Sequence, residues 1–586
     1  LICKDLSESH GTHCASIAAG SFMDYKDSFT GKYATSGRLG GMAPDAELYL
    51  ALSMPTKEQE EKYPELKDEL DNINSMQALY TMKHFAEKEG KPLIVSWSAN
   101  NHDGFHDGTS TMARFIGNYC KEGNLMALCA SNEGNDSMYI DRTISKGRTL
   151  KCVVKKSGSD PNFDAFIKTD KEVKLDLVIV DKNHQPVYTC NLPLTSLASQ
   201  NSDVNFSVEV KLDNAQQPAT KEVIVNHDKY KSIGDEVAKY IKKGALTVAI
   251  YAGTSLDAND QSINYVNIQF SGEELSFVED AVTEKELYMP MLLITPVGED
   301  VRMQGWGDYC GVYTNTMADE ATNTPGTAEN SMGDWCTTGE PVVIGAYTTD
   351  TSVPNPDYPL MSDKPLIAEE DEVLGRYTTF SSFGHDFSEA RRPYPDVSAP
   401  GYAIYAASNS FLKDDVFRST AYSGQFVGQQ EPRQYPYAIM SGTSMSTPAA
   451  AGIMALWVQA ALDKGTTLTN DDIKDIIRHS SVTDDFTKVY PLRYGVGKIN
   501  AYKGLLYVLG IETAIPELST KHIGATLNGR TLHISGDLDT QVTLYNLAGQ
   551  KVLDTHATAG IVELPHLPAG VYAVKFGSLG STLIRL

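Results

Sequence analysis

Residues 441–452 read SGTSMSTPAAAG, and this stretch decides how the whole chain is interpreted. A Gly-Thr-Ser turn runs into a helix of small residues that Pro448 interrupts near its start. Such a turn presents the hydroxyl of Ser444 at a helix N-terminus, where backbone N–H groups and the helix dipole favour negative charge. The stretch therefore predicts a serine nucleophile at the start of a core helix.

Two further segments supply partners for that serine. Residues 10–15 read HGTHCA and predict a second small-residue helix, which begins with His10. A serine hydroxyl needs a base within reach, and an imidazole with a pKa near ~6.5 can take and return a proton. Residues 130–134 read ASNEG and follow an apolar run, so the amide of Asn132 could donate to a developing oxyanion. Together these residues predict acyl-transfer chemistry.

The same residues also have simpler interpretations. His10 and His13 could form a metal pair, but no His-Glu-x-x-His pattern is present, so a zinc site is disfavoured. Ser444 could be an ordinary helix cap. The segment is not Gly-x-Ser-x-Gly, since residue 446 is Ser, so an α/β-hydrolase elbow fits poorly.

Composition narrows the class of partner. The chain has 586 residues, with 50 Lys and Arg against 75 Asp and Glu, for a net charge of −25. This balance argues against nucleic acid or an anionic membrane as partner, and no apolar run predicts a transmembrane segment. The eight cysteines show no Cys-x-x-Cys pair. Bridges Cys152–Cys190 and Cys310–Cys336 are left open, and Cys14 is expected to be a buried free thiol beside the active site.

The order of apolar runs predicts four domains or parts of domains. Residues 1–145 and 276–512 alternate helices with apolar strands, which predicts an α/β fold with a parallel sheet flanked by helices. The expected helices lie near 10–20, 73–89, 110–122, 446–463 and 470–479, and the expected strands near 48–52, 92–98, 125–130 and 341–346. The charged segment 56–72 is expected to be a solvated loop or short helix.

Two regions have a different, all-β pattern. Residues 146–275 carry short alternating runs separated by turn residues, at 173–180, 204–211, 222–226, 246–251 and 265–270, and predict an inserted β-sandwich. Residues 513–586 carry further runs at 531–534, 541–546, 560–564, 570–576 and 581–586, punctuated near 548–550 and 568–570, and predict a small separate β-sandwich.

The three blocks around His10, Asn132 and Ser444 resemble the histidine, oxyanion and serine blocks of the subtilisin-like serine proteases, in that family's order. Supporting segments at 41–48, 96–100, 380–384 and 395–401 resemble the family too, so the likeness covers roughly residues 1–145 and 276–512. The resemblance implies Ser444 as nucleophile, His10 as general base and acid, and Asn132 as oxyanion donor. It also implies that Ser98, Ala99 and Asn100 bind the substrate backbone and line its primary pocket, and that similar insertions are jelly-roll-like.

One part of the family pattern is missing. The family's Asp-x-Gly block, on the first core strand, does not occur before His10, and Asp5 lies too close to it, with no strand before it. The triad aspartate is therefore expected upstream of Leu1, together with a core strand. Loss of such an aspartate lowers turnover by about 10⁴-fold in serine proteases.

The C-terminal segments 542–550 and 564–572 and the final Leu583–Leu586 resemble the sorting domain of type IX secretion. That resemblance implies passage across a bacterial outer membrane and a secreted or cell-surface protein, with the secretion machinery as partner.

The sequence thus predicts an exported serine endopeptidase that acts on protein or peptide substrates. The chemistry requires no cofactor and no metal ligand is assigned, while a structural calcium ion is left open. The alternative is a degenerate subtilisin fold that acts as a surface binding protein.

Overall fold

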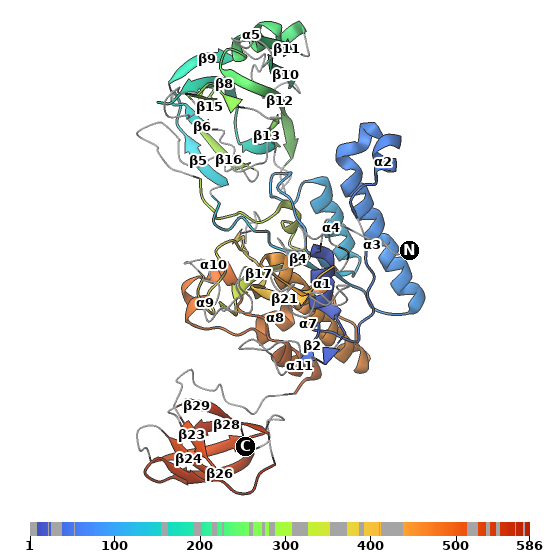
Figure 1. The fold of residues 1–586 in the computed structure, drawn as a ribbon, viewed down its shortest axis with the longest axis vertical. Helices are drawn as coiled ribbons and strands as arrows, with labels where there is room; N and C mark the ends of the chain where they lie inside the picture. Colours follow the sequence, from blue (N-terminus) through green and yellow to red (C-terminus); the bar gives the residue numbers. More distant parts are fainter. Residues whose placement is uncertain are drawn as a thin grey trace. The chain divides into compact units, whose positions relative to one another are not determined.

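Figure 1 shows the computed structural model, in which the chain divides into two compact units, Leu1–Leu505 and Leu506–Leu586. Each unit is described by itself. The structure describes residues 9–21, 23–24, 38–51, 53–136, 138–153, 162–183, 185–190, 202–213, 220–225, 228–256, 262–271, 276–279, 287–307, 326–351, 372–385, 392–409, 411, 437–511, 525–534, 539–546, 551–568, 570–577 and 580–585.

A parallel sheet forms the centre of the α/β part. Its strands follow the order β20–β17–β4–β3, and every neighbouring pair is parallel. They are β3 (Ile94–Trp97), β4 (Leu125–Cys129), β17 (Val342–Thr348) and β20 (Val397–Tyr402). All five residues of β4 are buried, as expected where helices cover both faces of a parallel sheet. The predicted α/β fold class with a parallel sheet is confirmed.

Alternate residues of β4 meet different helices. Met126 and Leu128 pack in one core with residues of α3 (Leu70–Glu89) and α4 (Thr111–Lys121). The residues between them point to the other face of the sheet, because side chains alternate along a strand. There α7 (Thr443–Asp463) packs on all four strands and on α1 (His10–Ala19). A Cβ on Gly452 of α7 would lie 2.5 Å from the Ala18 carbonyl oxygen, so α1 and α7 approach closely only because such residues are small.

The predicted helices match α1, α3, α4, α7 and α8 (Asn470–Ser480) within three residues at each end. The strand expected near 48–52 is wrong: residues 48–51 form no strand and Leu52 lies outside the described residues. Its apolar side chains instead line a cavity described below. The charged segment forms the short helix α2 (Lys57–Lys62), which a capping box of Thr56 and Gln59 begins, and the 3-10 helix η1 (Pro64–Glu69).

Two antiparallel sheets make up the inserted region, and all five strand runs expected there lie in strands, apart from Asn226, which is outside the described residues. One sheet has the order β11–β10–β12–β13–β7–β16–β5, with β14 beside β12, and the other β6–β15–β8–β9. One apolar core draws residues from both sheets. Bounds are β5 (Tyr139–Ile144), β6 (Leu150–Val153), β7 (Asn162–Thr169), β8 (Val173–Asp181), β9 (Pro186–Cys190), β10 (Ser202–Asp213), β11 (Thr220–Val225), α5 (Lys231–Val237), β12 (Ile241–Leu256), β13 (Ser262–Ser271), β14 (Ser276–Phe277), β15 (Tyr288–Pro296) and β16 (Val301–Gly307).

The sheets of the insert extend beyond the predicted limits of 146 and 275. Strand β5 lies before that range, and β15 and β16 lie after it. Strand β15 falls in the range 276–512, which the sequence placed in the α/β part, and its apolar run does not alternate. It is an inner strand of its sheet, between β6 and β8, and Met291, Leu292 and Ile294 are all buried. Burial on both faces removes the alternation that would have marked it as part of the insert.

Register excludes the Cys152–Cys190 bridge. Cys152 on β6 lies opposite Leu292, Leu292 lies opposite Leu177, and Leu177 lies opposite Cys190 on β9. Three strand spacings of about 4.8 Å separate the two cysteines by about 14 Å, whereas a disulfide needs Cα atoms within about 7 Å. Cys336, from the other open pairing, is a buried free thiol, and its suggested partner Cys310 lies outside the described residues.

Short elements complete the first unit: β1 (Met23–Asp24), β2 (Arg38–Leu39), η2 (Asp228–Tyr230), η3 (Asp334–Cys336), β18 (Gly384–His385), β19 (Pro393–Tyr394), β21 (Ile404–Ala407), β22 (Tyr437–Met440), α9 (Asp485–Val489), α10 (Pro491–Tyr494) and α11 (Ala501–Leu509), which crosses the division between the units. In the described part of the chain, α7 alone has the length and apolarity of a membrane-crossing helix. Its most apolar window is 78% buried, as in the core helix of a globular domain.

The second unit contains two antiparallel sheets around one apolar core. Strands β23 (Ala525–Asn528), β24 (Thr531–Ile534) and β27 (Ile561–Glu563) form one sheet. The other contains β26 (Lys551–Ala557), β25 (Thr540–Tyr545), β28 (Val571–Phe576) and β29 (Gly580–Arg585). The five predicted strands of the tail are confirmed by β24, β25, β27, β28 and β29, whereas residues 548–550 and Ala569 lie outside the described residues.

Candidate active site

Ser444 is the second residue of α7, directly after the turn at Gly442. Pro448 explains how this serine is held. A helix interior normally bonds the N–H of residue 448 to the carbonyl of residue 444, but proline has no N–H. The Ser444 carbonyl instead accepts hydrogen bonds from Ser98 Oγ at 2.8 Å and from Cys14 Sγ at 3.3 Å. The proline therefore frees a backbone acceptor that anchors the first turn of α7 to two other elements.

The Ser444 hydroxyl is tied to the end of strand β3. Its Oγ donates to the Ser98 carbonyl at 3.3 Å, so Ser98 and Ser444 are joined by two reciprocal hydrogen bonds. The hydroxyl is partly exposed and lies in the first turn of a 21-residue helix. The N–H groups of that turn favour negative charge beside it, as a nucleophilic serine requires.

His10 is the first residue of α1, and Cys14 lies one turn later on the same helix. The Cys14 sulfur lies 4.0 Å from His10 Nε2 and also bonds the Ser444 carbonyl, so it links the predicted base to the predicted nucleophile. Burial raises the pKa of Cys14 to about 11, against weaker opposing hydrogen bonds. The thiol is therefore protonated at neutral pH. Cys14 is free, as predicted, although half-buried where a buried residue was expected, and it acts as a hydrogen-bond donor and not as a thiolate nucleophile.

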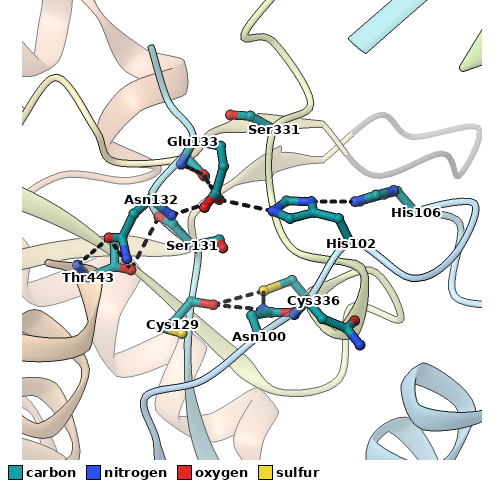
Figure 2. Close-up of polar contacts among 12 residues, drawn as sticks. Asn100, His102, His106, Cys129, Ser131, Asn132, Glu133, Ser331, Cys336 and Thr443 are labelled. Atoms are coloured by element: carbon teal, nitrogen blue, oxygen red, sulfur yellow. Dashed lines mark hydrogen bonds and ion pairs between the residues drawn. The ribbon is translucent and has the colours of Figure 1, made fainter. Parts of the chain in front are cut away.

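Asn132 follows β4 in a loop where Ser131 has a φ of 92°. Its Oδ1 accepts from the Thr443 backbone N–H at 2.9 Å and from Thr443 Oγ1 at 3.1 Å. A backbone N–H can only donate, so this contact fixes which end of the amide faces the helix. The Nδ2 end is thus the end of the amide left to donate hydrogen bonds, while the oxyanion role of Asn132 stays a prediction (Figure 2).

The three predicted substrate-binding residues have different environments. Ser98 is committed to Ser444, as described above, and Ala99 lines the large cavity beside His10. The Asn100 amide bonds the Cys129 carbonyl and the Cys336 sulfur through Nδ2, each at 3.0 Å, and accepts from the Trp335 N–H through Oδ1. The Asn100 side chain therefore supports the loop at 333–336, which leaves only its backbone for a substrate.

A buried carboxylate and two histidines adjoin the Asn132 loop, and the sequence analysis assigned them no role. Glu133 Oε2 accepts from the Asn132 N–H at 2.8 Å and lies 3.0 Å from His102 Nε2. His102 Nδ1 lies 2.9 Å from His106 Nε2, and Figure 2 shows the row from Thr443 to His106. The sequence contains a weak signal for this row: His102 and His106 are four residues apart, and Glu133 directly follows Asn132. Only the fold brings the two segments together.

A cavity of about 770 Å³ opens beside His10. Its lining is mostly apolar and comes from α1, α3, α7, β3 and residues 43–53. Strand β3 is at one end of the sheet: it pairs with β4 on one side, and no other described strand pairs with it. Residues Ile94 to Ser98 line this cavity, so the open edge of the sheet faces it.

No three His, Cys, Asp or Glu side chains of the described segments cluster as a metal site requires. The geometry so far defines a class: a serine at a helix N-terminus on a parallel α/β sheet, with a histidine helix packed beside it, as in serine hydrolases.

Comparison with known proteins shows which proteins this part of the chain is similar to. Residues 291–497 match the family model "Subtilase family", a range that contains Ser444. Serine protease AprX of Bacillus subtilis is 33% identical over 143 residues, which are 24% of this chain and 27% of that protein. Subtilisin-like protease SBT4.3 of Arabidopsis thaliana is 30% identical over 177 residues, 27% of this chain and 22% of that protein. Residues 291–497 are thus similar to the subtilase family, and about a quarter of the chain is similar to serine proteases of the subtilisin-like type.

The chain spans about a quarter of the length of the curated relatives it matches. Among solved structures, the Clostridium perfringens CspB protease is similar with a TM-score of 0.48 and 16% identity, over 85% of this chain and 81% of that one.

Proposed function

We propose that this protein is a serine endopeptidase that cleaves protein or peptide substrates through an acyl-enzyme on Ser444. In this mechanism His10 takes the hydroxyl proton as Ser444 attacks the scissile carbonyl, then returns it to the leaving amine. The Asn132 amide and the Ser444 N–H stabilise the oxyanion, a role worth about 3 kcal/mol per donor in subtilisin, a member of the matched family. One observation carries the proposal. The Ser444 carbonyl accepts hydrogen bonds from Ser98 and Cys14, because Pro448 has no N–H to donate to it, and these bonds fix the first turn of α7 beside the histidine helix.

The triad aspartate of this proposal comes from a strand outside the sequence described here, paired with the open edge of β3. Two features support this. A strand edge that faces an apolar cavity leaves backbone donors and acceptors without partners, which is costly unless another strand covers it. The cavity at that edge also reaches His10, so a carboxylate at the end of such a strand could orient the imidazole.

A fluorophosphonate probe tests the assignment, applied to the product of the complete gene. Labelling is expected at Ser444 and is lost in S444A. It is retained in S441A, a matched control because the Ser441 hydroxyl accepts from the Ala403 N–H and has no contact with the site among the described residues. Peptide hydrolysis should fall by about 10⁶-fold in S444A or H10A, a value taken from subtilisin.

The alternative is a degenerate protease fold that binds partners at the cell surface. An unlabelled Ser444 in a folded wild-type protein would refute the peptidase proposal and favour this alternative. Labelling of S444A at another residue would also refute it, because the nucleophile would then be elsewhere.

The proposal includes export across a bacterial outer membrane, with the second unit as the sorting domain. Its support is that residues 506–586 form a compact unit with an apolar core of its own, as a transferable signal requires. Fusion of residues 513–586 to a periplasmic reporter, in a host with type IX machinery, should bring the reporter to the cell surface. Retention of the reporter in the periplasm, while a native cargo tail is exported, would refute this part.

A further inference from the structure

We infer that His102 is a positioning residue for the oxyanion donor: with Glu133 and His106 it fixes the Asn132 loop, and the insert holds the far end of this row. The inference rests on the proposed function, because it concerns how that reaction's oxyanion site is kept in place.

Glu133 is the centre of the arrangement. Its side chain is buried, and one oxygen, Oε2, receives the Asn132 N–H, His102 Nε2 and, at 3.3 Å, Ser382 Oγ. The Glu133 N–H donates back to Ser382 Oγ at 2.9 Å. A carboxylate buried this deeply is stable only when charged or strongly donating groups surround it. His102, with 2% of its surface exposed, is the titratable partner among these contacts.

The protonation states agree with this geometry. Burial would raise the pKa of Glu133, but the charge and hydrogen bond of His102, with those from Ser131 and Asn132, outweigh burial and lower it. Burial, together with repulsion from His102 and Lys168, places the pKa of His106 well below its usual value. Glu133 is then a carboxylate and His106 is neutral. Whether His102 carries one proton or two, its Nε2–H donates to Glu133 while its Nδ1 pairs with His106.

The insert fixes the other end of the row. The His106 ring stacks on Trp306 of β16, with centroids 5.1 Å apart and an angle of 18°. The next residue, Asp107, pairs with Lys168 of β7 at 2.8 Å, and the ammonium group also lies 5.2 Å from the Trp306 ring centre. The His106 N–H donates to Asp334 at 3.0 Å. His106 has a φ of 48°, a strained conformation that persists only where its surroundings impose it.

These contacts make the position of Asn132 depend on His102. Thr443 holds the Asn132 side chain, and Glu133 Oε2 holds its backbone N–H. Without the donor at His102, the Glu133 carboxylate would take up a proton or turn toward water, and either change releases that N–H. A displacement of about 1 Å in a catalytic group can cost about 10²-fold in rate. Such a loss affects transition-state stabilisation, so it should lower kcat and leave KM nearly unchanged.

The test is a double-mutant cycle in the product of the complete gene. H102L should lower kcat between about 10- and 100-fold with KM within about twofold, and H102Q, which keeps an amide donor, should recover most of the loss. If His102 acts through Asn132, H102L in an N132A background should change kcat by less than about twofold. The matched control is H385L, which removes a different histidine–glutamate contact, with Glu329, and should keep wild-type kinetics.

Affinity for a peptide boronate provides a second measurement. Its tetrahedral adduct uses the oxyanion donors, so H102L should weaken boronate binding at least fivefold more than binding of the product peptide. If H102L does not fold, H102N serves in its place, because its shorter side chain cannot reach both neighbours.

The inference would be overturned if H102L lowered kcat by the same factor in the wild-type and N132A backgrounds. It would also be overturned if both H102L and H102N kept the wild-type kcat. In either case an active, Ser444-labelled wild type leaves the proposed function intact. An inactive, unlabelled wild type would refute both.

Discussion

The ion pair of Lys168 and Asp107 should stabilise the junction between the insert and the active-site loop by several kcal/mol. The ammonium and carboxylate lie 2.8 Å apart, and their side chains are only 8% and 1% exposed. K168M leaves the Asp107 charge buried with only Thr109 as a described donor, through its N–H at 3.1 Å and its hydroxyl at 2.5 Å. Breaking a buried pair in this way costs about 3–5 kcal/mol, and because Thr109 retains part of the stabilisation we expect about 3 kcal/mol.

The measurement is native-state hydrogen exchange on peptides that cover residues 102–110 and 162–169, because a large chain with separable parts does not unfold in two states. The free energy of opening should fall by about 3 kcal/mol in K168M. It should recover by about 2 kcal/mol in the double variant D107N/K168M, which removes both charges. The exposed pair Lys231–Asp235 is the matched control, and K231M should change local stability by less than about 1 kcal/mol. The reasoning would be refuted if the free energy of opening fell by less than about 1 kcal/mol in K168M. It would also be refuted if the loss in D107N/K168M equalled the sum of the losses in D107N and K168M.

Three further predictions concern groups around the site. Burial raises the pKa of Asp334 to about 7, well above the 3.8 of an unperturbed carboxyl. Between these values the folded state binds more protons, so local stability should fall as pH rises from 4 to 7, and D334N should flatten that dependence in native-state hydrogen exchange of residues 102–110. C14S keeps a donor to the Ser444 carbonyl and should retain kcat within about threefold, whereas C14V should lower it about tenfold; equal kcat values would contradict this. Thiol titration should find slow reaction in the native protein and at least five free thiols after unfolding without reductant, whereas fewer would contradict the free state of Cys14, Cys120, Cys129, Cys190 and Cys336.

The parts of the fold that the sequence predicted are those with a local signal. Helix α4 has a strong spacing of apolar residues and a capping serine, Ser110, whose Oγ accepts the Ala113 N–H, whereas α1 and α7 were predicted from runs of small residues that follow His10 and Gly442. The antiparallel strands of the insert alternate apolar and polar residues because one face of each sheet is buried. Strand β15 lost that signal because both of its faces are covered. The run near Leu48 has the composition of a strand but no described partner, and a strand needs partners that composition cannot supply.

The site was predictable where it depends on blocks of residues and not where it depends on contacts across the fold. Asn132 and Ser444 belong to recognisable segments, and the structure brings those segments together through Thr443. The Glu133–His102–His106 row has no sequence block of its own: its members lie on two loops, and their roles follow from burial and charge. The Cys152–Cys190 bridge failed for the same reason, since spacing along a chain does not give distance between strands.

Pro448 connects the sequence and the mechanism most directly. In the sequence it is an anomaly, a proline in the sixth position of a long helix, where it should destabilise. In the structure its missing N–H leaves the Ser444 carbonyl to Ser98 and Cys14, one at the end of β3 and the other on the histidine helix. P448A should therefore bond residue 448 to Ser444 and compete with both contacts. The helix would gain a hydrogen bond, while the serine would lose its link to the base. A P448A protein that is more stable yet slower would show that the proline is retained for the site.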